Sequence, residues 1–406
     1  MTTPRFDDAR ILMYSHDTFG LGHLRRCREI AHALVEAYRG VSVMIISGAT
    51  IAGAFDYRVR VDFVKIPSVI KLRNGEYQSM AEHTSLEETL KMRRGIILQT
   101  AKTFSPDIFI TDKEPLGLQG EIEETLVWLK TQGTHLVLGL REVMDAPDRL
   151  DAEWARRDVL TKIDAYYDSI WAYGPKGFHD PLAGLAAPAG VRAKMRYTGF
   201  LRRSLSRAES AHPRPDQPFT LVTTGGGGDG TGLIHAVFAA HRLDPTLPQA
   251  VTVLGPYVPA RDRAALLAEA ATLPSVEVID FDNRMEDLVA DAACLIGMGG
   301  YNTFCEVLSF DKPALIVPRT EPRMEQAIRA LRGAELGMVQ VMSAEQAADP
   351  ARLAAALRAL PMAPRPSQSV EASARAMLGL DGLSSIIADV GDWLTARRHP
   401  HLQTAT

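Results

Sequence analysis

Cysteine, long apolar runs and a strong excess of one charge are all missing from this 406-residue sequence. Its three cysteines, Cys27, Cys294 and Cys305, lack the spacing of a metal site or a disulfide framework, which favours a reducing compartment. No stretch approaches the ~20 apolar residues of a membrane-spanning helix. The first residues also lack the apolar core of a signal peptide. We therefore expect a cytoplasmic protein, with peripheral membrane contact left open.

The balance of charge argues against one class of partner. The chain has 45 basic and 49 acidic residues, a formal net charge of -4. Proteins that bind nucleic acid over a broad surface carry an excess of basic residues, so no nucleic-acid partner is predicted. With 46% hydrophobic residues the chain can bury sizeable cores. Its length predicts two domains of roughly 150–200 residues.

Two common nucleotide-binding signatures are missing as well. Gly20-x-Gly22 lacks the third glycine of the dinucleotide fingerprint, which argues against a nicotinamide enzyme. The glycine-rich segment 223–232 lacks the Gly-Lys-Ser/Thr of a Walker loop. We expect no cofactor.

No metal is expected either. His16, Asp17 and His23 supply too few ligands for a zinc site. Asp280-Phe-Asp282 resembles the metal-binding Asp-x-Asp of some sugar transferases, but a helix cap at Asp282 or at the next residue explains it better.

Short apolar runs alternate with longer amphipathic stretches along the chain. Leu24–Tyr38, for example, places Cys27, Ile30 and Leu34 on one helical face. Such alternation predicts parallel strands joined by right-handed helical crossovers. The predicted strands are Arg10–Tyr14, Val41–Ser47, Val61–Lys65, Ile108–Thr111, His135–Leu140, Ser169–Ala172, Phe219–Thr223, Gln249–Leu254, Val276–Phe281, Cys294–Ile296 and Ala314–Val317.

The pattern breaks once, at a segment rich in Arg, Ser and Pro that is typical of a linker. We predict a first domain over residues 1–201, a linker over 202–218, a second domain over 219–380, and a C-terminal helix and tail over 381–406. Each domain is expected to be a doubly wound, Rossmann-like α/β sheet that faces the other across a cleft. Ligands of such sheets bind at the carboxyl ends of the strands.

Two glycine-rich turns at those strand ends carry most of the functional information. Gly20-Leu-Gly22-His23 follows the first strand, and Gly297-Met-Gly-Gly-Tyr-Asn-Thr303 follows the strand at Cys294–Ile296. A strand, a glycine turn and a helix N-terminus form an anion site, because N–H groups and the helix dipole converge there. Two such turns predict a cleft that holds a diphosphate-bearing molecule and a second substrate.

His23 is the candidate base. It falls near a helix N-terminus, where the dipole favours a neutral imidazole that accepts protons and titrates in the neutral range. A capping histidine explains the spacing equally well. Asp112, at the end of its strand, is expected either to orient His23 or the acceptor, or to cap the strand end.

The second half offers candidate contacts to a nucleotide. The backbone of Gly300, Tyr301, Asn302 and Thr303 can bind phosphate. Glu306 can accept hydrogen bonds from both hydroxyls of a ribose, because a carboxylate only accepts and its bonds are charge-assisted. The alternative is that Glu306 merely complements the helix N-terminus. The loop with Gly225, Gly226 and Gly227 is predicted to contact phosphate or to line the cleft.

Taken together, these motifs resemble the GT-B fold glycosyltransferases, especially the lipid-intermediate N-acetylglucosaminyltransferase of peptidoglycan synthesis and related predicted glycosyltransferases. The resemblance covers most of the chain and is best in the second half. The motifs that carry it, in the family's order, are Phe281-Asp-Asn-Arg-Met, Gly297-x-Gly-Gly-x-x-Thr-x-x-Glu306, Lys312-Pro-Ala-Leu-Ile-Val-Pro318 and Glu325-Gln326.

The resemblance implies roles for the matching residues. The backbone near Phe281 and Asp282 would hold uracil, residues 300–303 would line the diphosphate, and Glu306 would bind the ribose. Glu325 and Gln326 would touch the donor sugar, and Arg203 matches a donor-phosphate arginine. The family usually has Gln-Gln or Asp-Gln at 325–326 and Gly-Gly-Thr-Gly-Gly-His in the N-terminal loop, so the donor sugar and the acceptor are left unassigned.

The N-terminal loop, Gly22-His-Leu-Arg-Arg-Cys27, also resembles nucleotide-sugar hydrolases of the same fold, whose corresponding histidine helps activate water. We predict an inverting, metal-independent transferase that moves the sugar of a UDP-sugar to an acceptor hydroxyl. The acceptor would be a glycan, a lipid-linked molecule or a small molecule. Gly20 and Gly22 would shape the acceptor side. A hydrolase that uses His23 to activate water and a nucleotide-sugar-binding protein without turnover remain the alternatives.

Overall fold

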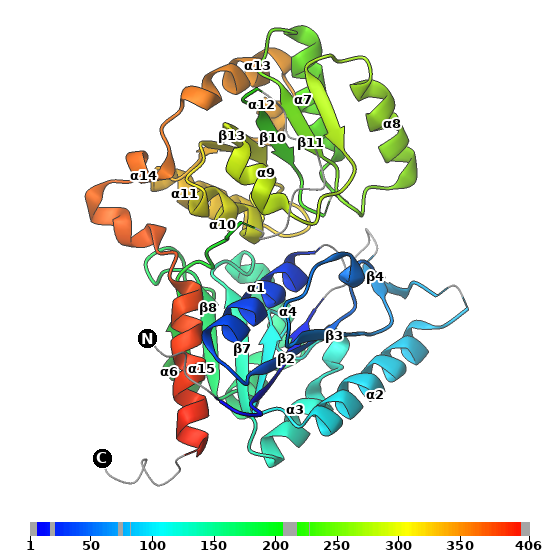
Figure 1. Ribbon diagram of the computed structural model, residues 1–406, viewed down its shortest axis with the longest axis vertical. Helices are drawn as coiled ribbons and strands as arrows, with labels where there is room; N and C mark the ends of the chain where they lie inside the picture. Colours follow the sequence, from blue (N-terminus) through cyan, green and yellow to red (C-terminus); the bar gives the residue numbers. More distant parts are fainter. Residues whose placement is uncertain are drawn as a thin grey trace. The chain divides into compact units, whose positions relative to one another are not determined.

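The computed structural model describes residues 6–16, 21–71, 76–81, 83–205, 217–226 and 228–398. The chain divides into two compact units (Figure 1). Residues 1–201 and 381–406 form the first unit, and residues 202–380 form the second. Each is an α/β unit built around one parallel sheet, as the alternating apolar and amphipathic segments predict.

The first unit has a seven-stranded sheet in the order β3-β2-β1-β6-β7-β8-β9, and every pairing in it is parallel. The order reverses between β1 and β6, which is the pattern of a doubly wound sheet. A separate antiparallel hairpin pairs β4 with β5. The strands are β1 (Arg10–Ser15), β2 (Ser42–Ser47), β3 (Val61–Lys65), β4 (Val69–Lys71), β5 (Tyr77–Ser79), β6 (Ile108–Asp112), β7 (His135–Arg141), β8 (Ser169–Tyr173) and β9 (Met195–Tyr197).

Helices cover this sheet, and side-chain hydrogen bonds satisfy backbone groups at several of their ends. At the start of α2, Ser85 and Glu88 form a reciprocal capping box. At the end of α1, the Arg60 guanidinium donates to the carbonyls of Tyr38 and Val41. The helices and 3-10 turns of this unit are α1 (Gly22–Ala37), η1 (Ala52–Ala54), α2 (Leu86–Phe104), η2 (Leu118–Gly120), α3 (Glu123–Thr131), α4 (Pro147–Ala155), α5 (Val159–Tyr166), α6 (Ala189–Ala193) and α15 (Gly382–Arg398).

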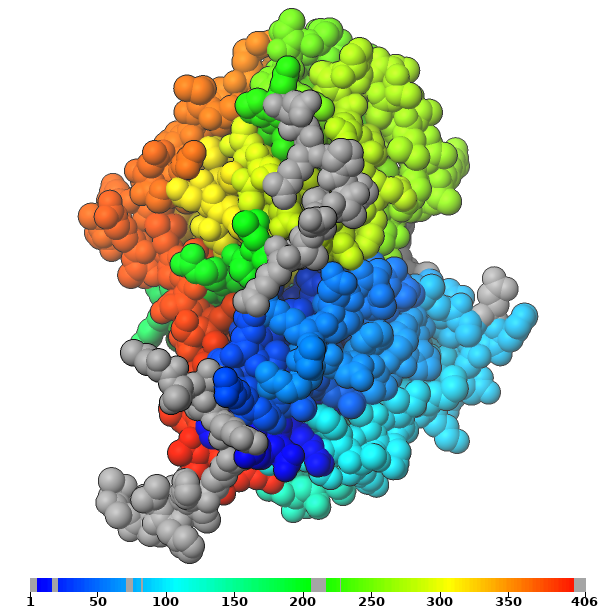
Figure 2. All heavy atoms as spheres, in the orientation of Figure 1, coloured from blue at the N-terminus to red at the C-terminus, as the bar shows by residue number. Residues whose placement is uncertain are grey.

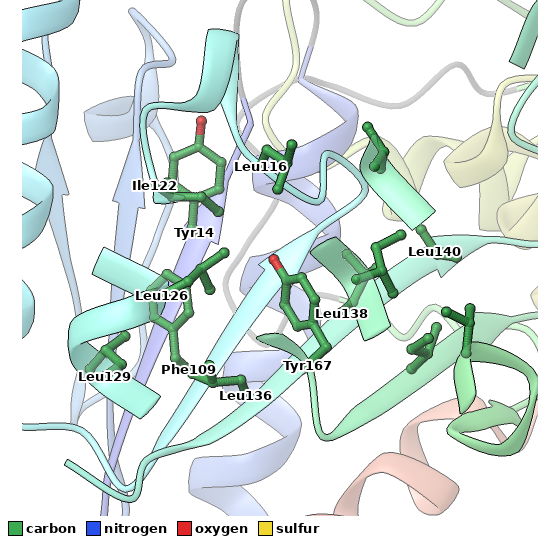
Figure 3. Packing of buried hydrophobic residues seen from close by; sticks show 14 of the residues in the cluster. Tyr14, Phe109, Leu116, Ile122, Leu126, Leu129, Leu136, Leu138, Leu140 and Tyr167 are labelled. Carbon is green, nitrogen blue, oxygen red and sulfur yellow. The ribbon is translucent and has the colours of Figure 1, made fainter. Parts of the chain in front are cut away.

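One hydrophobic core of the first unit lies between the sheet and the helices that follow β5. Figure 3 shows Phe109 of β6 and Leu136 of β7 beside Leu126 and Leu129 of α3. All four are fully buried, and burying one such side chain stabilises a fold by about 1.5–3 kcal/mol. This core packs β1, β6 and β7 against those helices.

The second unit has a six-stranded, all-parallel sheet in the order β12-β11-β10-β13-β14-β15. This is the doubly wound order of a Rossmann fold, with its reversal between β10 and β13. The strands are β10 (Thr220–Thr223), β11 (Ala250–Val253), β12 (Val276–Ile279), β13 (Cys294–Gly297), β14 (Ala314–Ile316) and β15 (Gln340–Val341).

Helices of the second unit pack on the sheet through apolar side chains that include those of two clusters among the described residues. Val237 of α7 belongs to one cluster, while Ile234 and Phe238 of the same helix belong to the other. The helices and 3-10 turns are α7 (Thr231–Leu243), α8 (Ala260–Ala270), α9 (Met285–Asp291), α10 (Tyr301–Ser309), α11 (Glu325–Glu335), α12 (Ala344–Ala347), α13 (Pro350–Ala359), η3 (Leu360–Met362), α14 (Pro366–Ser369) and η4 (Ala372–Leu378).

The last helix, α15, returns to the first unit. Figures 1 and 2 show it, in red, beside the blue N-terminal part of the chain. The Tyr38 hydroxyl donates to the carbonyl of Ile387 at 2.6 Å, and Trp171 Nε1 donates to Asp389 Oδ2 at 2.9 Å. Trp393 stacks on Trp171 with ring centroids 5.6 Å apart. The C-terminal helix is therefore part of the first unit's core.

The prediction of two doubly wound α/β sheets is confirmed, and each of the eleven predicted strands overlaps an observed one. Linker residues 206–216 and the tail from residue 399 onward lie outside the described residues. None of the helices in the described ranges is both long enough and apolar enough to cross a membrane.

Candidate active site

The first unit brings His23 and Asp112 together at the point where its strand order reverses. Ser15, the last residue of β1, is paired with Asp112, the last residue of β6. Helix α1 begins at Gly22, so His23 lies in its first turn. Doubly wound sheets bind their ligands at this switch point, outside the carboxyl ends of the strands.

A carboxylate, an imidazole and a guanidinium form one buried group here. His23 Nδ1 lies 2.6 Å from Asp112 Oδ2. Arg26, one turn further along α1, donates from Nε to Asp112 Oδ1 at 2.7 Å and from Nη2 to Oδ2 at 2.5 Å. The side chains of Asp112 and Arg26 are 1% and 2% exposed, while that of His23 is 16% exposed. Asp112 thus binds two side chains, which favours an orienting role over the strand-end cap that the sequence left open.

Burial and charge set the protonation states of this group. Burial lowers the pKa of His23 from 6.5 to about 4, although the bond to Asp112 acts in the opposite direction. Burial alone would raise the pKa of Asp112, but Arg26 and His23 hold it well below its usual range. At neutral pH the pair is a neutral imidazole beside an ionised carboxylate. The expectation that His23 titrates in the neutral range is therefore wrong, because His23 is desolvated.

The ionised carboxylate also fixes the tautomer of His23. A carboxylate only accepts hydrogen bonds, so the proton of His23 resides on Nδ1 and the lone pair on Nε2. Arg26 Nη2, 3.4 Å from Nδ1, is itself a donor and does not alter this assignment. The arrangement can take a proton from a hydroxyl or from water at Nε2, and Asp112 can stabilise the imidazolium that forms.

The second unit places its two glycine loops side by side at its own switch point. Thr223 at the end of β10 is paired with Gly297 at the end of β13. Gly225 and Gly299 in the following turns have φ of 70° and 74°, a conformation that other residues rarely adopt. A Cβ added at Gly300 would meet no atom of the described residues within 4 Å. The N-terminus of α10 therefore opens onto space that a ligand can enter.

Arg203 lies at this helix terminus. Its Nη2 donates to Asn302 Oδ1 at 2.7 Å, and its backbone N–H donates to Ser309 Oγ at 2.9 Å. Arg203 is buried, as are Asn302 and Thr303 in the first turn of α10. The first N–H groups of a helix have no partner within the helix, and its dipole is positive at that end. A guanidinium beside them favours a polyanion such as a diphosphate.

Glu306 lies in the second turn of α10 and is 1% exposed. The first turn contains no acidic residue. Since the effect of a helix dipole falls off within the first turn, this position favours a ligand contact over the alternative that Glu306 merely complements the helix N-terminus. Its carboxylate is held on the same short helix as the predicted phosphate-binding residues.

The two residues implied to contact the donor sugar begin α11. Arg319 Nη2 donates to Glu325 Oε1 at 2.8 Å, and the backbone N–H of Arg319 donates to Gln326 Oε1 at 3.2 Å. Arg319 also pairs with Asp229, in the glycine-rich loop after β10. Arg319 thus ties Glu325 and Gln326 to that loop.

The Asp280-Phe-Asp282 segment follows β12. Asp282 accepts a hydrogen bond from the backbone N–H of Arg284 at 2.6 Å. The N-cap of α9 is Arg284, whose own side chain makes no capping hydrogen bond, so the helix begins one or two residues later than the predicted cap. Asp280 pairs with Arg263 at the surface, and Phe281 lies between the two aspartates. Within the described ranges, no group of three or more His, Cys, Asp and Glu side chains could hold a metal.

Two predicted glycines, Gly20 and Gly227, lie outside the described residues. Gly22 is the first residue of α1, and the carbonyl of Gly226 accepts from the N–H of Tyr257 at 3.0 Å. The structure thus brings one set of predicted residues to the switch point of the first unit and another to that of the second.

Sequence reasoning missed three arginines. Arg26 follows His23 by three residues on the same helical face, a spacing that could have revealed it. Arg319 had no signal beyond a polar loop. Arg329 is fully buried in α11 and donates from Nη1 to the carbonyl of Gly299 at 3.2 Å, a contact that depends on tertiary packing.

Comparison with known proteins gives a family match for most of the second unit. Residues 220–380 match the model of the glycosyltransferase family 28 C-terminal domain. A protein described as an uncharacterized glycosyltransferase from Methanosarcina acetivorans is 24% identical over 338 residues, which cover 80% of this chain and 83% of that protein.

Solved structures share the fold over nearly the whole chain. The glycosyltransferase of kitacinnamycin has 15% identity and a TM-score of 0.63, with 95% of this chain and 99% of that chain covered. MurG from Acinetobacter baumannii has 14% identity and a TM-score of 0.57, with the same two shares covered. The UDP-GlcNAc 2-epimerase from Neisseria meningitidis has 13% identity and a TM-score of 0.60, with 94% and 98% covered. The chain thus has the GT-B fold, and the matched domain and the relative support a transferase enzyme of the glycosyltransferase class.

Proposed function

We propose that the protein transfers a sugar from a UDP-sugar to an acceptor hydroxyl, with inversion at the anomeric carbon and without a metal ion. The observation that carries this proposal is the Arg26–Asp112–His23 group at the switch point of the first unit. It holds one imidazole neutral, with its lone pair on Nε2. Such an imidazole is suited to removing a proton from a hydroxyl.

In the proposed reaction, His23 Nε2 takes the proton of the acceptor hydroxyl while the acceptor oxygen attacks the anomeric carbon. The bond from that carbon to the diphosphate breaks, and UDP leaves with the bonding electron pair. One displacement of this kind inverts the anomeric configuration. Asp112, 2.6 Å from Nδ1, stabilises the imidazolium as it forms.

The second unit would hold the donor. Arg203 and the N-terminus of α10 would stabilise the departing diphosphate electrostatically. Glu306 would accept the ribose hydroxyls, Phe281 and Asp282 would hold the base, and Glu325 with Gln326 would contact the sugar. Structures of the same fold include an S. aureus protein with UDP, an epimerase bound to UDP-GlcNAc, and a glycosyltransferase with dTDP, which supports a nucleoside diphosphate as the ligand class.

The acceptor in this proposal is a glycan, a lipid-linked molecule or a small molecule, and the enzyme works in the cytoplasm. The same imidazole could activate water, so hydrolysis is the competing outcome. The two reactions share a donor and differ in the product, which is a glycoside in one and a free sugar in the other.

The test uses the purified protein with UDP, GDP and ADP, and then with UDP-glucose and UDP-N-acetylglucosamine. We expect UDP to raise the melting temperature more than GDP or ADP, because binding to the folded state alone stabilises it. Arg203→Met should abolish the UDP-induced rise, and Arg202→Met, at the exposed neighbour, should not. Equal shifts for all three nucleotides would refute the uracil site.

UDP release followed by NMR of the product then identifies the reaction. A glycoside of inverted configuration is the expected product when an acceptor is supplied. Free sugar as the sole product with every acceptor supplied would assign the protein to the hydrolases instead.

A further inference from the structure

A second histidine, His16, lies beside the proposed base. It directly follows β1, at the same switch point as Asp112, and is buried. Its ring centroid is 5.7 Å from that of His23, with the two rings at 80° to one another. The catalytic step described above uses only His23, so this second imidazole at the site has no assigned task.

His16 is held by a hydrogen-bonded chain of its own. Its Nδ1 lies 3.4 Å from the hydroxyl of Tyr14, which donates to Glu121 Oε1 at 2.5 Å. Arg93 in turn binds both carboxylate oxygens of Glu121, with Nε and Nη2 each at 2.6 Å. Arg93 and Glu121 are fully buried side chains. Figure 3 shows the Tyr14 ring next to the apolar side chain of Ile122.

This chain of bonds determines which nitrogen of His16 carries a proton. Tyr14 has one hydroxyl proton and donates it to Glu121, so toward His16 it can only accept. The backbone N–H of Leu118 also donates to the Tyr14 oxygen, at 3.2 Å. Nδ1 of His16 therefore carries the proton, and Nε2 is left as an acceptor. Burial lowers the pKa of His16 from 6.5 to about 3, which keeps the ring neutral.

The two histidines are thus prepared in the same way by unrelated residues. The Nδ1–H of His23 faces an oxygen of Asp112, whose carboxylate is paired with Arg26. The Nδ1–H of His16 faces the hydroxyl of Tyr14, which is bonded to Glu121, whose carboxylate is paired with Arg93. Burying an ion pair is costly, and apolar side chains of similar volume often pack at least as stably. The ion pair behind His16 therefore suits the orientation of a polar ring better than the filling of a core.

We propose that His16 binds the acceptor: its Nε2 accepts a hydrogen bond from the hydroxyl next to the one that His23 deprotonates. The acceptor class would then be a vicinal diol, as sugars and polyols present, rather than an isolated alcohol. This inference rests on the proposed function, since it assigns a second hydroxyl to the same acceptor. It involves no covalent step of its own.

The test compares two probe acceptors, cis-1,2-cyclohexanediol and cyclohexanol, with a UDP-sugar that the enzyme turns over. The amount of glycoside formed from each probe is measured. The amount formed from the diol is halved, because the diol has two hydroxyls, and is then divided by the amount formed from cyclohexanol. One neutral hydrogen bond contributes about 0.5–1.5 kcal/mol, so we expect the wild type to favour the diol about two- to tenfold. Equal use of the two probes by the wild type would overturn the proposal.

Two conservative variants separate binding from packing. The amide of His16→Gln can place an oxygen near the Nε2 position, whereas the amide of His16→Asn reaches only the Nδ1 position. We expect the glutamine variant to keep most of the preference and the asparagine variant to lose it, with the UDP-induced melting shift unchanged in both. His32→Asn is the control and should keep the preference; His32 lies in α1, and its Nε2 accepts a hydrogen bond from the backbone N–H of Arg58.

A preference retained by His16→Asn would refute the role of Nε2. A second outcome is that the wild type breaks down no nucleotide sugar, either with an acceptor or with water. That result would refute the proposed function, and the inference about His16 with it.

Discussion

Replacing His23 by alanine is the most informative perturbation of this protein, because it changes the rate and the acid stability in separable ways. The variant lacks the proposed proton acceptor but keeps the Arg26–Asp112 pair. General-base catalysis typically contributes 10²–10⁴-fold, so we expect turnover to fall by about that factor. Affinity for UDP should be unchanged, because the proposed donor residues belong to the second unit.

The stability effect follows from the pKa of His23. The group has a pKa of about 4 in the folded protein and 6.5 as a free side chain. Its contribution is fully present above pH 6.5 and is lost as pH falls toward 4, since the unfolded chain binds a proton that the folded chain does not. At about 1.4 kcal/mol for each pKa unit, the wild type should lose about 3 kcal/mol over this interval on account of His23.

The His23→Ala variant should not show this loss of stability in acid. At neutral pH it also lacks the charge-assisted hydrogen bond to Asp112, and should be less stable than the wild type by about 1–3 kcal/mol. Near pH 4 the difference should shrink to zero or reverse. The rate of the wild type should be flat through neutral pH and fall only in acid, with an apparent pKa near 4.

Tryptophan fluorescence during urea unfolding measures this effect in the first unit alone. All four tryptophans, Trp128, Trp154, Trp171 and Trp393, belong to that unit. Unfolding midpoints at about pH 7 and about pH 4.5 give the two differences, and UDP release gives the rate. A His23→Ala protein that turns over normally, or whose stability deficit is the same at both pH values, would refute the reasoning.

Three further predictions concern the donor site and the C-terminal helix. Glu306→Gln, which keeps the shape of a 1%-exposed side chain but removes its charge, should raise KM for the UDP-sugar about tenfold and leave kcat within about twofold; the reverse pattern in steady-state kinetics would contradict a ribose contact. Turnover should survive excess EDTA, because Arg203 and the α10 terminus supply the positive charge; loss of activity that Mg²⁺ or Mn²⁺ restores would revive a metal role for Asp280 and Asp282. Asp389→Ala removes the acceptor of Trp171 Nε1 and the partner of Arg196, and should destabilise the first unit by about 1–3 kcal/mol in tryptophan-detected unfolding; an unchanged midpoint would mean that α15 contributes little to this core.

Elements with a strong hydrophobic pattern were predictable, and short ones were not. Each predicted strand overlaps an observed strand, and the inner strands were the clearest because a strand buried on both faces needs a nearly unbroken apolar run. The two-residue β15 and the three-residue β9 are too short to show any period. The hairpin of β4 and β5 was missed for the same reason.

The candidate site divides along a similar line. His23, Glu306 and the glycine turns could be located because each lies next to a strand end or a helix start, which sequence signals mark. The long-range hydrogen bonds between side chains could not be predicted. Arg203 lies 99 residues from Asn302 in the chain, and Arg93 lies 28 residues from Glu121. No local signal encodes such separations.

The sequence by itself determined that the chain folds into two doubly wound sheets, with glycine turns at the switch point of the second, because strand and helix periodicity and glycine conformations are local properties. Only the tertiary structure decided the chemistry of the first site. The parallel register of β1 and β6 brings Asp112 to His23 across 89 residues. Burial then lowers the pKa of the imidazole, and the carboxylate fixes its tautomer. Desolvation and long-range charge depend on what surrounds a residue in space, which its neighbours in sequence do not specify.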